Sequence, residues 1–217
     1  MERSVRDAFM EALRAAITAS YGATPSARQQ SADYARIVNE RHFGRLRDAL
    51  DEAIDSGAQL EYGGAVDERA CYIEPTVLAS VPESATLMQD EIFGPILPVH
   101  TFDHLDEAIA TINQRENPLA LYHFTTDEAA TRTLLDHTQS GDVCVNDVIV
   151  HYMSPHLPFG GAGHSGIGAS GGVHGFREFS DQRSVLRRTG ASGLMQQLYP
   201  PYGRVTKKLV DWLLPWA

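Results

Sequence analysis

The sequence predicts an α/β fold, a layered and mostly parallel sheet with flanking helices. Along the middle of the chain, strand-like stretches alternate with helical patterns of moderate length, which is typical of this class. The chain has 217 residues, 43% of them hydrophobic and 21% charged, so it can bury a sizeable core. We find no internal repeat and no low-complexity linker other than one glycine-rich stretch.

Four segments have the apolar spacing of amphipathic helices, and we expect them over residues 4–20, 34–54, 104–114 and 127–138. The first should stop at Tyr21-Gly22 and the second at Gly57. Residues 22–26 are expected to form a loop. Strands are expected over residues 72–81, with a break at Pro75, and over residues 121–125 and 143–146.

The end of the chain predicts one more helix. Its apolar seam consists of Val205, Leu209, Trp212, Leu213 and Trp216. Packing of this seam on the protein is one interpretation, and an interfacial helix on a membrane is the other. No run approaches the roughly 18 apolar residues of a membrane span, so we expect no transmembrane segment.

Charge and cysteine usage narrow the functional classes. The formal net charge of -10 argues against nucleic-acid binding. Residues 183–217 carry six Lys or Arg but only one acid, Asp211, so we expect this basic tail to dock on the acidic body or on a partner subunit; a phosphate or membrane surface is the alternative. Cys71 and Cys144 have no C-x-x-C spacing, which favours a reduced, cytoplasmic setting.

The glycine-rich stretch contains G-x-G-x-x-G at Gly161, Gly163 and Gly166. A dinucleotide-binding loop needs a strand before this motif and a helix after it. Pro158 argues against the strand, and four further glycines argue against the helix. We therefore predict a connection whose backbone takes positive φ angles or passes close to other backbone, and not a pyrophosphate site.

Other candidate sites have weak signals. Ser165 lacks the following glycine of G-x-S-x-G, because residue 167 is Ile. Four histidines near the glycine stretch match no common metal spacing and are expected to be solvated or hydrogen-bonded loop residues: His151, His156, His164 and His174. Cys144 lies in an apolar strand and is expected to be buried and inert. We predict no metal site.

The segment from Gln89 to Pro98 places carboxylates directly before an apolar run that Gly94-Pro95 interrupts. A turn here would display Glu91 and Phe93 at the lip of a strand. An ordinary helix-to-strand turn is the simpler interpretation of the same residues.

Four motifs in order resemble the aldehyde dehydrogenase family: Tyr72-Ile-Glu-Pro-Thr-Val-Leu, Glu91-Ile-Phe-Gly-Pro, Gly141-Asp-Val-Cys-Val-Asn-Asp and Leu157-Pro-Phe-Gly-Gly. The continuation from Gly175 to Leu186 is similar to the class 3 branch, which includes coniferyl aldehyde dehydrogenases. The resemblance implies oxidation of an aldehyde to an acid with NAD or NADP, and a dimer that pairs through the strand around Arg183 to Leu186.

The same resemblance assigns residues. It implies that Glu91 binds the nicotinamide ribose, that Phe93 contacts the nicotinamide side of the cofactor, and that Asn146, His156 and Phe159 shape the substrate pocket. It assigns residues 1–180 to a partial catalytic domain and residues 181–217 to an oligomerisation strand and basic tail. The chain resembles only the C-terminal half of the family, so the cofactor site is incomplete.

No residue of this chain matches the family's nucleophilic cysteine or its general-base glutamate, so we assign no catalytic residue. Thioester chemistry requires a thiolate, and we therefore expect the isolated chain to be inactive. The alternative hypothesis is a non-enzymatic truncated subunit that pairs with a full-length dehydrogenase or with a separately encoded N-terminal half. Exposed apolar surface should then make the chain dependent on a partner.

Overall fold

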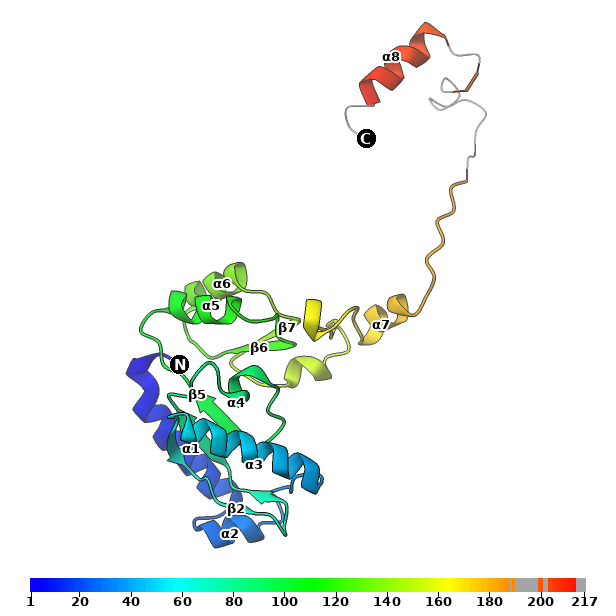
Figure 1. The fold of residues 1–217 in the computed structure, drawn as a ribbon. Helices are drawn as coiled ribbons and strands as arrows, with labels where there is room; N and C mark the ends of the chain where they lie inside the picture. Colours follow the sequence, from blue (N-terminus) through cyan, green and yellow to red (C-terminus); the bar gives the residue numbers. More distant parts are fainter. Residues whose placement is uncertain (188, 190–198, 201–202, 214–217) are drawn as a thin grey trace.

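The computed structural model describes residues 1–187, 189, 199–200 and 203–213 (Figure 1). Its α-helices are α1 (Arg6–Tyr21), α2 (Pro25–Gln30), α3 (Glu40–Asp55), α4 (Thr86–Gln89), α5 (Leu105–Asn113), α6 (Glu128–His137), α7 (Gly172–Glu178) and α8 (Arg204–Leu213). Its strands are β1 (Gln59–Tyr62), β2 (Val66–Asp67), β3 (Tyr72–Ile73), β4 (Thr76–Ala79), β5 (Ile96–Val99), β6 (Ala120–His123) and β7 (Asp142–Val145). Short 3-10 turns are η1 (Arg3–Val5), η2 (Val150–Met153) and η3 (Gly163–Ser165).

The described strands form three small sheets, in the orders β1-β4-β5, β2-β3 and β6-β7. Pairing is parallel for β4 with β5 and for β6 with β7, but antiparallel for β1 with β4 and for β2 with β3. The α/β class is therefore confirmed, whereas the expected mostly parallel single sheet is not seen among the described residues. The reason lies in the connections: a parallel pair needs a crossover, which α4 and α6 supply, and segments without a helix return as antiparallel neighbours.

Four predicted helices are present, with shifted ends. α1 ends at Gly22, whose φ of 117° lies in the region that favours glycine. α3 begins six residues later than predicted, because the side chain of Asn39 accepts a hydrogen bond from the backbone of His42 and caps the helix there. α5 and α6 lie within the predicted ranges, and Asp127 caps α6. Figure 1 shows these last two side by side over β6 and β7.

Two sequence predictions about helices were wrong. The expected loop at residues 22–26 instead contains the start of α2, where Thr24 caps the helix and Pro25 occupies its first turn. The glycine-rich stretch was expected to be followed by no helix, yet α7 begins at Gly172. Its seven residues show too little apolar periodicity to be recognised, and a helix of this length depends on its tertiary setting.

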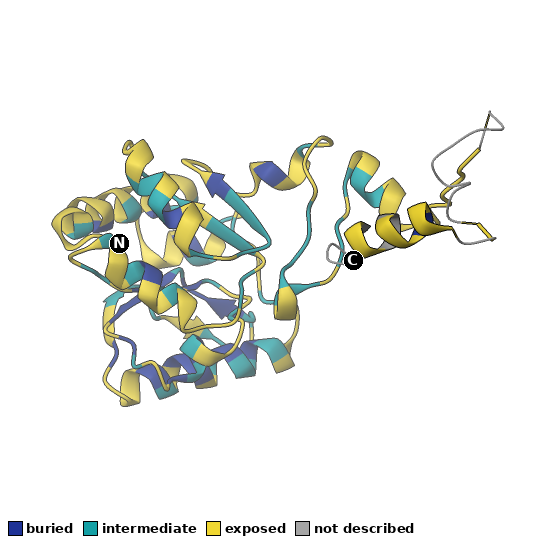
Figure 2. Cartoon of the chain, turned by 90° about the horizontal axis from the view of Figure 1, so that it is seen from above, coloured by how far each residue is buried: buried dark blue, intermediate teal, exposed yellow. Residues whose placement is uncertain are grey.

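The main hydrophobic core lies between α3 and the first sheet. Phe43, Leu46 and Leu50 on α3 pack with Ile73 and Leu78 in one buried cluster. A smaller cluster joins α1 to the same sheet from its other side through Met10, Val77 and Val99. Figure 2 shows that buried residues are concentrated in this part of the chain and that exposed residues dominate toward the C-terminus.

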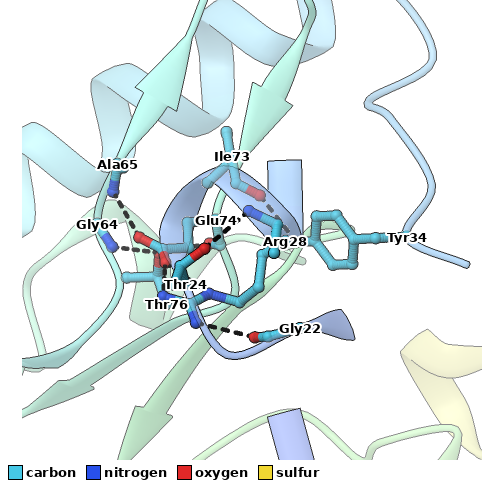
Figure 3. Close-up of polar contacts among 10 residues, drawn as sticks. Gly22, Thr24, Arg28, Tyr34, Gly64, Ala65, Ile73, Glu74 and Thr76 are labelled. Carbon is cyan, nitrogen blue, oxygen red and sulfur yellow. Dashed lines mark hydrogen bonds and ion pairs between the residues drawn. The ribbon is translucent and has the colours of Figure 1, made fainter. Parts of the chain in front are cut away.

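A buried ion pair joins α2 to the segment between β3 and β4 (Figure 3). The Nη2 and Nε groups of Arg28 donate to Oε1 of Glu74 at 2.6 and 2.9 Å, and its Nη1 donates to the carbonyl of Gly22 at 3.1 Å. The other carboxylate oxygen of Glu74 accepts from the backbone of Ala65 at 3.4 Å. Both charged side chains are buried, and every polar end of the pair has a partner.

The predicted tail helix is present as α8, which Figure 1 draws away from the rest of the protein. Val205 and Trp212 of its seam are 60% and 68% exposed, while the remaining seam side chains lie outside the described residues. No helix in the described part of the chain is long and apolar enough to cross a membrane. Residues 181–187 belong to no strand of this chain, and Leu186 is 99% exposed.

Candidate functional site

The turn between α4 and β5 presents Glu91 and Phe93 outward. Both side chains are exposed, Phe93 to 79%, whereas Ile92 between them is partly buried against the main core. Phe93 has a φ of 47°, in the left-handed region that non-glycine residues rarely adopt. A strained backbone of this kind persists only where its surroundings fix it. The turn therefore displays a carboxylate and an aromatic ring before β5, as predicted.

Arg45 of α3 fixes this turn. Its guanidinium donates to the backbone carbonyls of Glu91 at 3.3 Å and of Ile92 at 2.5 Å. At Gly94, an added Cβ would lie 2.6 Å from a terminal methyl of the buried Leu46, so a larger residue would require that side chain to shift. These contacts hold the backbone, and the carboxylate of Glu91 has no hydrogen-bond or ion-pair partner among the described residues.

Asn146 lies directly after β7 with a φ of 60°. Its carboxamide makes two hydrogen bonds of 2.8 Å with the backbone of Thr125, one as donor and one as acceptor. This pairing joins the carboxyl ends of β6 and β7 beside a hollow of about 580 Å³ that Thr131, Arg132 and Val145 help to line. In this structure the side chain of Asn146 holds the backbone at Thr125 in place, and its expected position in a substrate pocket stays a prediction.

Phe159 is tied to Ser170 by two backbone hydrogen bonds of 2.9 and 2.7 Å, which close the glycine-rich stretch into a loop. Within it, a Cβ at Gly160 would lie 2.2 Å from the carbonyl of Gly168, and Gly168 itself has a φ of 78°. The expectation of positive φ angles and close backbone approach is thus confirmed, and close packing is what requires glycine.

The ring of Phe159 belongs to a row of aromatic side chains. Tyr152 meets it edge to face with the ring centroids 4.9 Å apart, the ring of His151 lies 6.0 Å from it, and that of Tyr122 in β6 lies 5.8 Å from His151. His156, the other predicted pocket residue in this segment, is exposed. No hydrogen bond or ring contact among the described residues joins this row to the Glu91–Phe93 turn.

Sequence reasoning missed two residues of this region. His151 was expected to be solvated or hydrogen-bonded, but it is 9% exposed and neither ring nitrogen has a partner among the described residues. Its position within the apolar run from Val148 to Met153 was the available signal. In the sequence, Arg45 cannot be distinguished from the other charged residues on the polar face of its helix, so its contact with the turn could not be predicted.

The weaker candidates have ordinary structural environments. The hydroxyl of Ser165 donates to the carbonyl of Ala162 and accepts from its amide, and His164 pairs with Glu116 instead. Cys144 is buried, as predicted. Among the described residues, no three His, Cys, Asp or Glu side chains gather in a way that could hold a metal ion.

Comparison with known proteins identifies relatives over most of the chain. The sequence model of the "Aldehyde dehydrogenase family" matches residues 1–185. The chain is 45% identical over 188 residues to "Aldehyde dehydrogenase family 3 member A2" of Pongo abelii, covering 85% of this chain and 36% of that protein. It is 40% identical over 213 residues to "Aldehyde dehydrogenase family 3 member B2" of Mus musculus, covering 98% of this chain and 43% of the relative. The chain thus spans less than half the length of these relatives.

Solved structures of aldehyde dehydrogenases share the fold of this chain. A structure described as "Substrate bound state of Staphylococcus Aureus AldH" superposes with a TM-score of 0.83 at 40% identity, covering 98% of this chain and 45% of that one. An NAD-dependent aldehyde dehydrogenase from Sinorhizobium meliloti superposes with a TM-score of 0.75 at 30% identity, over 88% of this chain and 38% of the other. Sequence motifs, family match and fold converge, and the chain belongs to the aldehyde dehydrogenase family.

Proposed function

We propose that this chain forms part of an NAD(P)-dependent aldehyde dehydrogenase that oxidises an aldehyde to the carboxylic acid, and supplies one flank of its cofactor site. The observation that carries the proposal is the anchored turn, which displays Glu91 and Phe93 while Arg45 holds its backbone. One relative, from Rattus norvegicus, is named "Aldehyde dehydrogenase, dimeric NADP-preferring", which supports a nicotinamide cofactor of either kind.

The residues present fit one side of such a cofactor. An ionised carboxylate is an acceptor-only group and binds paired ribose hydroxyls strongly, and an exposed aromatic ring can press on a flat heterocycle. NAD or NADP would supply the hydride acceptor. Glu91 would orient the ribose, and Phe93 would limit where the nicotinamide lies. Asn146, His156 and Phe159 would shape the substrate side without taking part in bond making.

We further propose an aromatic aldehyde of the coniferyl type as substrate, which the aromatic row through Tyr122, Tyr152 and Phe159 supports.

The proposed division of the chain is a partial catalytic domain over residues 1–180 and an oligomerisation strand with a tail over residues 181–217. An extended segment with Val185 and Leu186 exposed supports pairing with a second copy or with the family's N-terminal half. Two free cysteines are consistent with a cytoplasmic location.

Complementation tests the function. The purified chain alone should form no NADH or NADPH with an aldehyde, because it carries no matching nucleophile. Co-expression with the N-terminal portion of the Staphylococcus aureus relative should restore aldehyde-dependent NAD(P)H formation. Turnover by the chain alone would contradict the proposed inactivity, and a soluble but inactive pair would contradict the proposed function.

In the active pair, Glu91→Gln should lower kcat/KM for the cofactor by about 10- to 100-fold, because the substitution removes charge-assisted hydrogen bonds. The neighbouring Asp90→Asn is a matched control, since Asp90 is also exposed and makes no side-chain contact among the described residues. Equal effects of the two substitutions would mean that net charge, and not a specific contact, is responsible.

A further inference from the structure

The imidazole of His151 is enclosed by aromatic rings. It lies in η2, between β7 and the glycine-rich loop in sequence, and its ring centroid is 5.8 Å from that of Tyr122 and 6.0 Å from that of Phe159. Only 9% of the residue is exposed. Phenylalanine would fill such a position with a flat ring of slightly larger size and no polar atom, so apolar packing alone does not explain a histidine.

Both ring nitrogens are buried and have no hydrogen-bond partner among the described residues. Buried polar groups in native proteins are nearly always paired, and an unpaired one destabilises the fold. Arg28 and Glu74 follow this rule, since both are buried and fully paired. The hydroxyl of Tyr72 and Oδ2 of Asp142 are also buried without a partner among the described residues, but His151 is the residue with two such atoms. An unpaired buried imidazole therefore indicates a group whose partner comes from a ligand.

The row of rings is open to solvent at its ends. Tyr122, next to His151 at one end of the row, is 39% exposed, and Tyr152, next to Phe159 at the other end, is 62% exposed. Phe159 between them is fixed through its backbone bonds to Ser170. Aromatic walls around one hydrogen-bonding group match a flat aromatic ligand that carries a single polar substituent.

We propose that His151 is a specificity-determining residue that hydrogen-bonds a hydroxyl substituent on the ring of an aromatic aldehyde, while Tyr122 and Phe159 hold that ring. A neutral imidazole has one donor and one acceptor nitrogen, so it can accept from a phenolic hydroxyl or donate to its oxygen. His151 takes no part in the oxidation itself. This inference rests on the proposed function, because it assumes that an aldehyde enters next to Phe159.

The first test is the thermal stability of the purified chain. His151→Phe replaces the imidazole by a somewhat larger apolar ring and removes both nitrogens, so it should raise Tm by about 2–4 °C for a chain of this size. The exposed His156→Phe is the matched control and should leave Tm unchanged. A fall in Tm with His151→Phe would show that the nitrogens are already paired in the ligand-free protein and would overturn the inference.

The second test observes the ligand directly. In chain labelled with ¹⁵N-histidine, 4-hydroxybenzaldehyde should shift the ring nitrogen resonances of His151, whereas benzaldehyde should shift them much less. Equal shifts with both probes would show ring stacking without a hydrogen bond, and no shift with either would show that nothing reaches His151. Both of these outcomes contradict the proposal.

The complemented enzyme separates this inference from the proposed function. His151→Phe should lower the ratio of kcat/KM for 4-hydroxybenzaldehyde to that for benzaldehyde by about 10-fold, the value of one hydrogen bond, and leave benzaldehyde turnover nearly unchanged. An unchanged ratio in an active enzyme would refute the role of His151 alone. If the complemented enzyme has no turnover but 4-hydroxybenzaldehyde still shifts the His151 resonances selectively, the proposed function is refuted and the binding of the hydroxyl by His151 is supported.

Discussion

Two regions of this molecule follow different rules of packing. The first region, residues 1–103, contains both hydrophobic clusters and the paired Arg28 and Glu74. The second region, residues 104–180, is shorter but contains most of the large apolar side chains that are exposed, among them Val150, Met153 and Phe179.

Their buried polar groups differ as well. In the first region, the hydroxyl of Tyr72 is the one buried side-chain atom without a partner among the described residues. In the second, Oδ2 of Asp142 and both nitrogens of His151 have none. Exposed apolar surface and unpaired buried polar atoms are what a surface shows when it is completed by another molecule or segment. The second region thus leaves more apolar surface exposed and more buried polar atoms without a partner than the first, although the first also displays Phe93 on the Glu91–Phe93 turn.

The largest effect is expected from breaking the ion pair of the first region. Arg28→Ala should lower the free energy of unfolding by about 3–5 kcal/mol, because it leaves the carboxylate of Glu74 buried without a counter-charge. Urea unfolding followed by circular dichroism measures this. Arg28→Met combined with Glu74→Leu should recover most of the loss, apart from the bonds to Gly22 and Ala65. A small effect of Arg28→Ala would mean that the site admits water.

Next in size is a cavity in the main core. Leu46→Ala should destabilise the chain by about 2–5 kcal/mol, because Leu46 is fully buried and supports Gly94. It should also loosen the Glu91–Phe93 turn, which faster amide exchange at Ile92 would report. The control is Leu97→Ala, whose side chain is 43% exposed. Equal losses from the two substitutions would contradict the assigned core.

A smaller change in stability, but a clear change in association, is expected in the second region. Replacing Val150 and Met153 together by Ser should alter the free energy of unfolding by only about 0.5 kcal/mol. It should reduce self-association in light scattering, since both side chains are largely exposed. Ser at the exposed Val38 and Leu60 of the first region is the control. Comparable reduction by the control pair would remove the distinction between the regions.

The smallest effect is a dependence on alkaline pH. Burial raises the pKa of Tyr34 and of Tyr72 above the ordinary value of 10.0. Because the folded pKa exceeds the unfolded one, this stability is fully present below about pH 10 and is lost as the pH rises through the folded pKa. The Tm of the wild-type chain should fall as the pH rises above about 10, and the Tm of the Tyr34→Phe variant should fall less steeply. The exposed Tyr199→Phe should leave the slope unaltered.

Much of the secondary structure followed from local patterns. The apolar spacing of α3 and α6 and the proline between β3 and β4 mark elements that the fold keeps, because packing there agrees with local preference. The short pieces β1, β2, α4 and α7 were not predicted, since elements of two to seven residues have too little periodicity and owe their form to neighbours.

The candidate site divides in the same way. The Gly-Pro turn after carboxylates predicts that Glu91 and Phe93 are displayed, and both are exposed, while their assignment to the cofactor rests on the family resemblance and stays a prediction. The contact of Arg45 and the enclosure of His151 could not be predicted, because each depends on contacts between residues far apart in the chain.

The sequence by itself determined the family, the α/β class, the main helices and the reason for the glycines, since these depend on motifs and on local backbone sterics. Only the tertiary structure decided how the strands divide into sheets, which basic residue anchors the Glu91–Phe93 turn, and that one histidine is buried without a partner among the described residues. Those outcomes depend on which surfaces meet, and hydrophobic burial and desolvation act between segments that no local pattern connects.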